Sequence, residues 1–203
     1  DVKTIVYNVN DSILTNNDVI VSAASCTTNC LAPVLNILQK NIGIKKGFMT
    51  TVHAYTNDQA TLDIAHKKGI KSRRGRACAQ NIVPSSTGAA KAIGLVIPEL
   101  LGKLDGNALR VPTADGSVVD LTLELNRNTS VEEINKLFSE NQNETIKFTM
   151  DPIVSSDCLG KKVGAIVDGL STSIVEADGS QLVKVLAWYD NEYGYTAQML
   201  RTA

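Results

Sequence analysis

Residues 19–33 read VIVSAASCTTNCLAP, and this stretch marks a short apolar strand that leads directly into a helix. We expect Val19-Ile20-Val21 to form a buried strand, since a short apolar run bounded by polar turns is typical of one. Beyond it, apolar residues recur at the spacing of one helix face until Gly43, which favours the helix end. These residues are Leu31, Val34, Leu35 and Leu38. Cys26 therefore lies at a strand-to-helix junction.

Outward from this junction, the chain favours strands more than helices. Alternating apolar and polar residues predict strands over residues 3–9, 48–54, 117–125, 163–167 and 182–189. Asp178-Gly179 is typical of a hairpin turn. Helices are expected over 89–97 and 130–141, the second opening with a capping box from Ser130 to Glu133. Runs of strands with few intervening helices indicate an α+β fold with a largely antiparallel or mixed sheet packed with helices.

Composition narrows the function classes. The 203 residues include 20 Lys and Arg against 21 Asp and Glu, and this net charge of −1 argues against a dedicated polyanion binder. The length suits one large domain or two small ones, with no need for disulfides or structural metal. No apolar run approaches the roughly 18 residues of a membrane span, and the first residues do not resemble a secretion signal. We therefore expect a cytoplasmic protein with no membrane segment and no nucleic-acid partner, whose four cysteines are thiols.

One segment departs from this near-neutral balance. Residues 66–76, the basic segment, carry six Lys or Arg and no acidic residue. The rest of the chain then has 14 basic against 21 acidic residues, a balance of −7. A solvated basic loop is the ordinary interpretation, and a local site for an anion or a partner is the alternative.

Cys26 is the best candidate nucleophile, because a thiol in the first turn of a helix lies at the positive end of the helix dipole. We expect this position to lower the thiol pKa toward a reactive thiolate. The small polar neighbours Ser25 and Thr27 can donate hydrogen bonds to an anion. The alternative for Cys26 is a small buried residue at a helix start. Cys30, four residues on, is poorly spaced for a disulfide, and we interpret it as structural.

A cysteine nucleophile needs a base, and the chain has two histidines. His53 ends a predicted strand, where active sites gather, whereas His66 opens the basic segment and is expected at the surface. His53 is the better candidate for the base, and a core or surface role is the alternative.

Anion-binding groups are expected on two further elements. Thr87 and Gly88 stand before the helix over 89–97, where free amides can bind an anion, although such residues most often only cap a helix. Arg110 lies in an apolar, strand-like setting and should either pair with a carboxylate or bind a phosphate. Residues 188–195 hold four of the nine aromatic residues, as core packing or as one wall of a flat-ligand pocket.

These blocks occur together, in the same order, in one known family. The string SCTTNCLAP at 25–33 resembles the active-site signature of phosphorylating glyceraldehyde-3-phosphate dehydrogenases. Four further blocks resemble that family, so that the resemblance covers essentially the whole chain: HAYT at 53–56, PSSTGAAKA at 84–92, LRVP at 109–112 and WYDNEYG at 188–194. It implies that residues 1–25 end a Rossmann-type NAD-binding domain and that 26–203 are the catalytic domain, clipped within its final helix.

The resemblance also implies roles for individual residues. Cys26 would attack the aldehyde of D-glyceraldehyde 3-phosphate, with His53 as the base. Hydride transfer to NAD would leave a thioester that inorganic phosphate cleaves to 1,3-bisphosphoglycerate in glycolysis. Thr56 and Arg110 would hold the substrate phosphate, and Asn191 would contact the nicotinamide. The attacking phosphate would be held by Ser25, Thr27, Thr87 and Gly88, with Arg74. No metal is implied, and the family forms homotetramers in which the basic segment belongs to a loop packed across subunits.

Two departures and three alternatives accompany this interpretation. The basic segment is longer than the usual loop of the family, so Arg73 or Arg74 could be the matching arginine. No G-x-G-x-x-G dinucleotide fingerprint occurs, and we therefore expect little or no activity from the 203 residues alone. The alternatives are an erythrose-4-phosphate dehydrogenase, a Cys–His hydrolase that needs no NAD, and a binding module acting through the basic segment.

Overall fold

One seven-stranded sheet, with helices packed on it, forms the centre of the structure. The computed structural model describes residues 2–203. The strand order is β4-β5-β3-β6-β9-β8-β7, in which β5 runs parallel to β3, β7 runs parallel to β8, and the other neighbours are antiparallel. The strands are β3 Ile44–Ala54, β4 Val83–Ser86, β5 Leu104–Val111, β6 Ser117–Leu125, β7 Ile146–Thr149, β8 Ala165–Ala177 and β9 Ser180–Tyr189. The predicted α+β class with a mixed, largely antiparallel sheet is confirmed.

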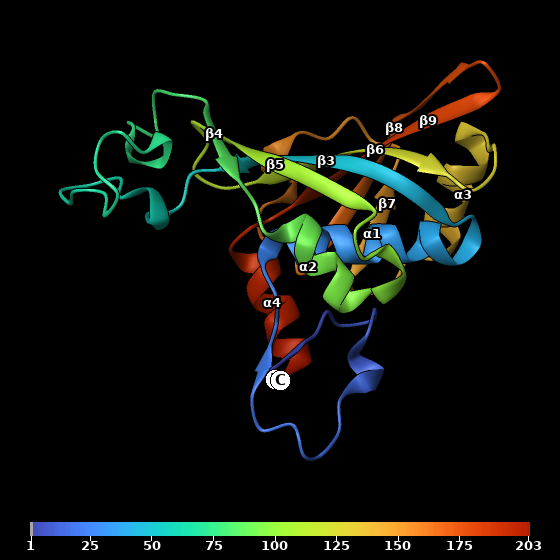
Figure 1. The fold of residues 1–203 in the computed structure, drawn as a ribbon, viewed down its shortest axis with the longest axis horizontal. Helices are drawn as coiled ribbons and strands as arrows, with labels where there is room; N and C mark the ends of the chain where they lie inside the picture. The colour runs from blue at the N-terminus through green and yellow to red at the C-terminus, as the bar shows by residue number, and fades with distance from the viewer. Residues whose placement is uncertain (1) are drawn as a thin grey trace.

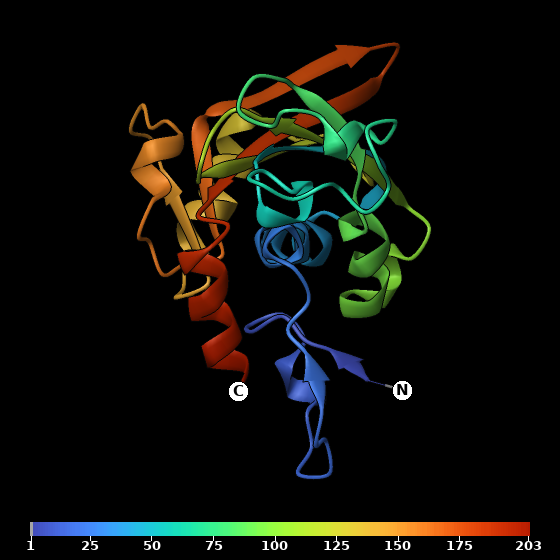
Figure 2. The same cartoon turned by 90° about the vertical axis from the view of Figure 1, so that its left-hand side faces the viewer.

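The helices cover one face of this sheet. In the described residues they are α1 Cys26–Asn41, α2 Ala89–Val96, α3 Val131–Glu140 and α4 Tyr193–Thr202. Figure 1 shows α1, α2 and α3 on the same side of the sheet, and Figure 2 looks along α1 with α2 and α4 on either side of it. The side chains of α1 from Thr27 to Leu35 are all buried, so this helix is the centre of the core.

The start and end of α1 follow the local sequence. Ser25 caps the helix, since its Oγ accepts a hydrogen bond from the Thr28 amide at 3.1 Å. Gly43 follows the helix with a φ of +84°, a left-handed conformation that glycine adopts without strain. The predicted strand-to-helix junction at Cys26 is confirmed.

The opposite face of the sheet is more exposed. Along β3, Met49, Thr51 and His53 are buried toward the helices. Side chains alternate between the two faces of a strand, so Phe48 lies on the other face, where it is 68% exposed.

The N-terminal strands are shorter than the sequence predicts. The prediction over residues 3–9 is wrong beyond β1 (Lys3–Thr4), because the Asn10 side chain accepts from the Val6 amide and donates to the Thr4 carbonyl, closing a turn. The expected buried strand over 19–21 is also wrong. Val19 and Ile20 are 92% and 72% exposed, and only β2 (Val21–Ser22) pairs with β1, in a separate two-stranded parallel sheet.

Other local predictions are confirmed, with two corrections. The predicted strand over 163–167 corresponds to β8, which begins only at Ala165 and continues to Ala177. Asp178 and Gly179 have φ values of 52° and 73° and form the β8–β9 hairpin turn. The helices over 89–97 and 130–141 correspond to α2 and α3. The capping box of α3 forms only in half: Ser130 Oγ accepts from the Glu133 amide, whereas the Glu133 carboxylate accepts from Arg127 and from the Thr129 hydroxyl. A charged donor binds a carboxylate more strongly than a backbone amide does.

Two further features concern membrane-spanning helices and the state of the cysteines. No helix within residues 2–203 combines the length and the apolar character needed to cross a membrane. The four cysteines are free thiols, of which Cys30, Cys78 and Cys158 are buried and Cys26 is partly exposed.

Candidate active site

Cys26 and His53 come together where α1 begins and β3 ends. The Cys26 Sγ lies 3.4 Å from the His53 Nε2. The sheet brings Arg110 to the same place, because β3 and β5 run parallel in a register that pairs His53 with Arg110. The structure thus unites three of the predicted site residues from three separate segments.

Hydrogen bonds orient the His53 ring. Its Nδ1 lies 2.7 Å from the Ala54 carbonyl oxygen, which can only accept, so Nδ1 carries the hydrogen. Arg110 Nη1, 3.1 Å from the same nitrogen, donates to this carbonyl and to the Thr56 hydroxyl, both at 2.9 Å. The Nε2 lone pair is therefore directed at the Cys26 thiol and can accept its proton.

The pKa of the Cys26 thiol is shifted in the opposite direction to the one expected from the sequence. Burial raises the pKa of the Cys26 thiol, and hydrogen bonds from Thr27 and the charge of Arg110 oppose this rise only in part. The expected lowering of this pKa by the helix dipole is therefore wrong. Burial, and then the charge of Arg110, lower the pKa of His53 from its usual 6.5 to about 4. At neutral pH the pair is a thiol beside a neutral imidazole, and a thiolate forms by proton transfer to His53.

The depressed pKa of His53 predicts a loss of stability in acid. Between pH 6.5 and about 4 the unfolded chain binds a proton at His53 that the folded chain does not, so the free energy of unfolding falls as the pH falls through this window. The difference of about 2.5 units corresponds to about 3 kcal/mol. Denaturant unfolding of the chain and of His53→Gln at pH 7, 5.5 and 4 measures this loss. This loss of unfolding free energy should be absent from His53→Gln. If the stability of the chain and that of the variant fell equally with pH, a His53 pKa of about 4 would be contradicted.

A second set of contacts surrounds Arg110. The Thr56 hydroxyl, which accepts from Arg110, donates to the Asp58 carboxylate, and this carboxylate also forms an ion pair with Arg74. Arg74 Nη2 donates to the Ser86 carbonyl oxygen at 3.1 Å. Thr56, Arg74 and Arg110 thus meet at the Asp58 carboxylate, although the resemblance assigns Arg74 to a different phosphate from the other two.

A cavity of about 390 Å³ adjoins Cys26 and joins the two sets of predicted residues. Its lining includes Ser25, Cys26, Thr27, His53, Arg74, Thr87, Gly88 and Arg110. Gly88 precedes α2, and a Cβ added there would meet no atom within 4 Å, so the backbone is open to a ligand. The Thr87 hydroxyl accepts from the Ala89 amide at 3.2 Å, which leaves its hydrogen available for an anion.

Tyr189 supports this cavity from beneath, a role that sequence reasoning did not assign to it. Its hydroxyl lies 2.9 Å from Thr27 Oγ1 and 2.7 Å from Thr51 Oγ1, and its ring meets the His53 ring edge-on with centroids 5.9 Å apart. Tyr189 is 1% exposed, so of the two interpretations of the aromatic cluster this residue follows core packing.

Asn191 does not line the cavity beside Cys26. It is buried at the end of β9, where its Oδ1 accepts from the Ser117 hydroxyl at 2.7 Å and from the Gly116 amide at 3.2 Å. These bonds fix the orientation of the amide and leave its Nδ2 hydrogens with only a long contact of 3.5 Å to Glu192.

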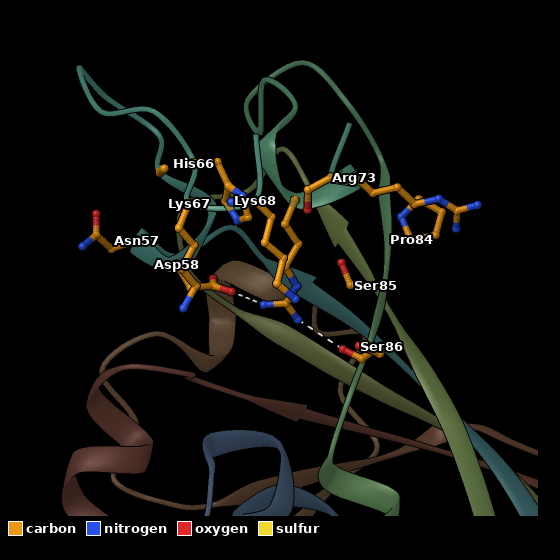
Figure 3. A pocket seen from close by; sticks show the side chains of 12 residues that line it. Asn57, Asp58, His66, Lys67, Lys68, Arg73, Pro84, Ser85 and Ser86 are labelled. Carbon is orange, nitrogen blue, oxygen red and sulfur yellow. Dashed lines mark hydrogen bonds and ion pairs between the residues drawn. The ribbon is translucent and has the colours of Figure 1, made fainter. Parts of the chain in front are cut away.

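The basic segment forms a second, larger cavity. Its volume is about 700 Å³, and its lining includes His66, Lys67, Lys68, Arg73 and Arg74 (Figure 3). Arg74 also lines the cavity beside Cys26, whereas Arg73 lies only on the outer side. The position of Arg74 therefore agrees better with a role beside Cys26. His66 is half-buried in this wall rather than free at the surface.

Sequence reasoning also missed Asp58. The available signal was an acidic residue two positions after Thr56, but its pairing with two arginines depends on the fold. Among residues 2–203, no three His, Cys, Asp or Glu side chains cluster in a way that could hold a metal ion.

A thiol in contact with a neutral imidazole, beside convergent anion-binding donors, is the arrangement typical of enzymes that use a cysteine nucleophile. The family model for the glyceraldehyde 3-phosphate dehydrogenase C-terminal domain matches residues 25–191, and the chain belongs to this family.

Curated relatives agree with this membership. Glyceraldehyde-3-phosphate dehydrogenases of Clostridium pasteurianum and Streptococcus pyogenes are each 57% identical to the chain over 202 residues, and that of Clostridium acetobutylicum is 55% identical. These alignments cover 100% of the chain and 60% of each relative. The chain therefore spans about 60% of the length of the relatives that it matches.

Proposed function

We propose that this chain is the catalytic part of an NAD-dependent, phosphorylating glyceraldehyde-3-phosphate dehydrogenase that acts in glycolysis. The observation that carries the proposal is the 3.4 Å contact between Cys26 Sγ and His53 Nε2 in a cavity lined by donors from several elements. In this proposal residues 1–25 end an NAD-binding domain and 26–203 form the catalytic domain. The separate β1–β2 sheet, outside the seven-stranded sheet, supports that division.

The contact between Cys26 and His53 supports a proposal for the first chemical step. Cys26 Sγ attacks the aldehyde carbon of D-glyceraldehyde 3-phosphate while the thiol proton passes to His53 Nε2, which faces it. The resulting imidazolium donates a hydrogen bond to the oxygen of the thiohemiacetal. Loss of hydride, which NAD would accept, would convert the thiohemiacetal to a thioester. Attack by inorganic phosphate would then release 1,3-bisphosphoglycerate, and the departing Cys26 sulfur would take its proton back from His53.

This reaction binds two phosphate groups, and the site has two groups of donors. Thr56 and Arg110 would hold the phosphate of the substrate. Arg74, which the resemblance places with the attacking phosphate, pairs with the Asp58 carboxylate next to them. The second set, for the attacking phosphate, comprises Ser25, Thr27, Thr87 and Gly88, with Arg74. Thr27 would contribute its backbone amide in the first turn of α1, beside a hydroxyl that also contacts Tyr189.

NAD would accept the hydride, and this chain offers one group to hold it. The Asn191 amide is fixed through its oxygen and keeps Nδ2 hydrogens to donate, which fits a carboxamide oxygen of nicotinamide.

Assembly and location belong to the same proposal. The exposed sheet face that carries Phe48 suits burial against a second copy, in agreement with a homotetramer of the full-length protein. The proposed setting is the cytoplasm, where cysteines stay reduced.

The test uses the chain joined to the NAD-binding part of the Clostridium pasteurianum relative. Reduction of NAD by D-glyceraldehyde 3-phosphate should require inorganic phosphate for turnover, and a thioester on Cys26 should appear by mass spectrometry only with NAD. The 203 residues alone should produce little or no NADH. Substrate cleavage without NAD would favour a Cys–His hydrolase. Faster turnover of erythrose 4-phosphate than of D-glyceraldehyde 3-phosphate would favour an erythrose-4-phosphate dehydrogenase.

A further inference from the structure

Three donor groups converge on the Asp58 carboxylate. The Thr56 hydroxyl donates to Oδ1, the Arg74 guanidinium pairs with Oδ2, and Arg110 Nη2 lies 3.8 Å from Oδ1. In Figure 3, dashed lines join Asp58 and Ser86 to the guanidinium group between them, which belongs to Arg74. Asp58 is therefore the acceptor at the centre of this cluster.

The proposed function assigns Thr56 and Arg110 to the phosphate of the substrate and Arg74 to the attacking phosphate, so all three groups are phosphate donors. Carboxylate and phosphate oxygens accept the same hydrogen bonds, and guanidinium groups bind either in a forked geometry. A phosphate group that bound to Thr56, Arg74 and Arg110 would meet donors already engaged by Asp58.

We propose that Asp58 acts as an internal competitor of the bound phosphate, so that this carboxylate sets the affinity of the site for phosphorylated ligands. The inference rests on the proposed function, because it concerns the same donors. It adds an affinity-determining residue that must turn away, or share its donors, when a phosphate binds.

The charge and the exposure of these side chains support displacement of the Asp58 carboxylate by a phosphate group. Burial opposes ionisation, but the Thr56 hydrogen bond and the Arg74 charge together hold the pKa of Asp58 below its usual value, so it is a carboxylate at neutral pH. Two guanidinium groups then face one carboxylate, which leaves a net charge of +1. The Asp58 side chain is 44% exposed while that of Arg110 is 12% exposed, so Asp58 can rotate toward solvent and Arg110 stays in place.

The alternative is that Asp58 orients the arginines and thereby strengthens phosphate binding. The two roles predict opposite effects for Asp58→Asn, which keeps the shape and one acceptor oxygen but removes the charge. A competitor predicts tighter phosphate binding, by about fivefold to tenfold, because the donors lose a charged partner. An orienting residue predicts weaker binding.

The experiment titrates the chain with inorganic phosphate at constant ionic strength and follows the heat of binding and the NMR signal of His53. Asp58→Asn should bind phosphate more tightly, and Asp58→Ser, a second variant without the charge, should do the same. Asp63→Asn is the matched control, since Asp63 is an exposed acid in the same loop without an ion pair in the described structure, and it should bind as the unaltered chain does.

Two results would overturn the inference, and they are distinguishable. In the first result, the unaltered chain binds phosphate and both Asp58 variants bind it equally or more weakly. This result contradicts the competitor role of Asp58 but not the proposed function. No phosphate binding by the unaltered chain or by any variant removes the competitor role together with the phosphate assignment of the proposed function.

Discussion

Iodoacetamide is expected to alkylate Cys26 faster than the other three cysteines, and His53→Ala is expected to slow the Cys26 reaction about 100-fold at pH 7. Cys30, Cys78 and Cys158 are buried, so the reagent reaches them slowly. Burial raises the pKa of the Cys26 thiol, which therefore depends on His53 Nε2 to accept its proton. Removal of the base should leave a thiol that reacts only through its small thiolate fraction.

Mass spectrometry of peptides from timed labelling measures both effects. His66→Ala is the matched control, since it removes the other histidine from the basic segment and should leave the Cys26 rate unchanged. Equal labelling of Cys26 and Cys158 would count against Cys26 as the nucleophile. An unchanged Cys26 rate in His53→Ala would count against His53 as the base.

Substitution of Arg110 should weaken phosphate binding and raise the pKa of His53 together. Arg110→Gln removes a charged donor, and we expect the dissociation constant for inorganic phosphate to rise by between about tenfold and about 100-fold. The Arg110 charge is, after burial, the main cause of the low pKa of His53, so the pKa should move upward from about 4 in the variant. Proton NMR of the His53 ring and calorimetric titration measure the two quantities.

Arg127→Gln is the control for Arg110. Arg127 forms an ion pair with Glu133 before α3, away from the residues that line the cavity beside Cys26. It should change neither phosphate affinity nor the His53 titration. A His53 pKa that stays at about 4 in Arg110→Gln would show that burial alone sets it.

Local sequence predicted the elements around the site well. The junction at Cys26, the helix end at Gly43 and the turn at Asp178-Gly179 depend on hydrogen bonds and backbone preferences within a few residues. The same reasoning was wrong for residues 19–21. An apolar run predicts burial only when a partner lies beside it, and Val19 and Ile20 extend beyond the two residues of β2.

The electrostatic prediction for Cys26 was wrong for a related reason. The position of a thiol in the first turn of a helix can be read from the sequence, but its burial cannot. Burial outweighs the helix terminus and raises the thiol pKa, so reactivity depends on His53 rather than on the dipole.

The sequence by itself determined the family resemblance, the α+β class and the identity of the candidate nucleophile and base, because motifs and periodicity are local properties. Only the tertiary structure decided that Cys26 touches His53, 27 residues away, and that Tyr189 contacts the His53 ring and the Thr27 hydroxyl. It likewise decided that His53 lies beside Arg110 and that Asp58 faces two arginines. These contacts depend on strand register: a shift of one residue between β3 and β5 would turn Arg110 to the other face of the sheet, and no short stretch of sequence specifies that register.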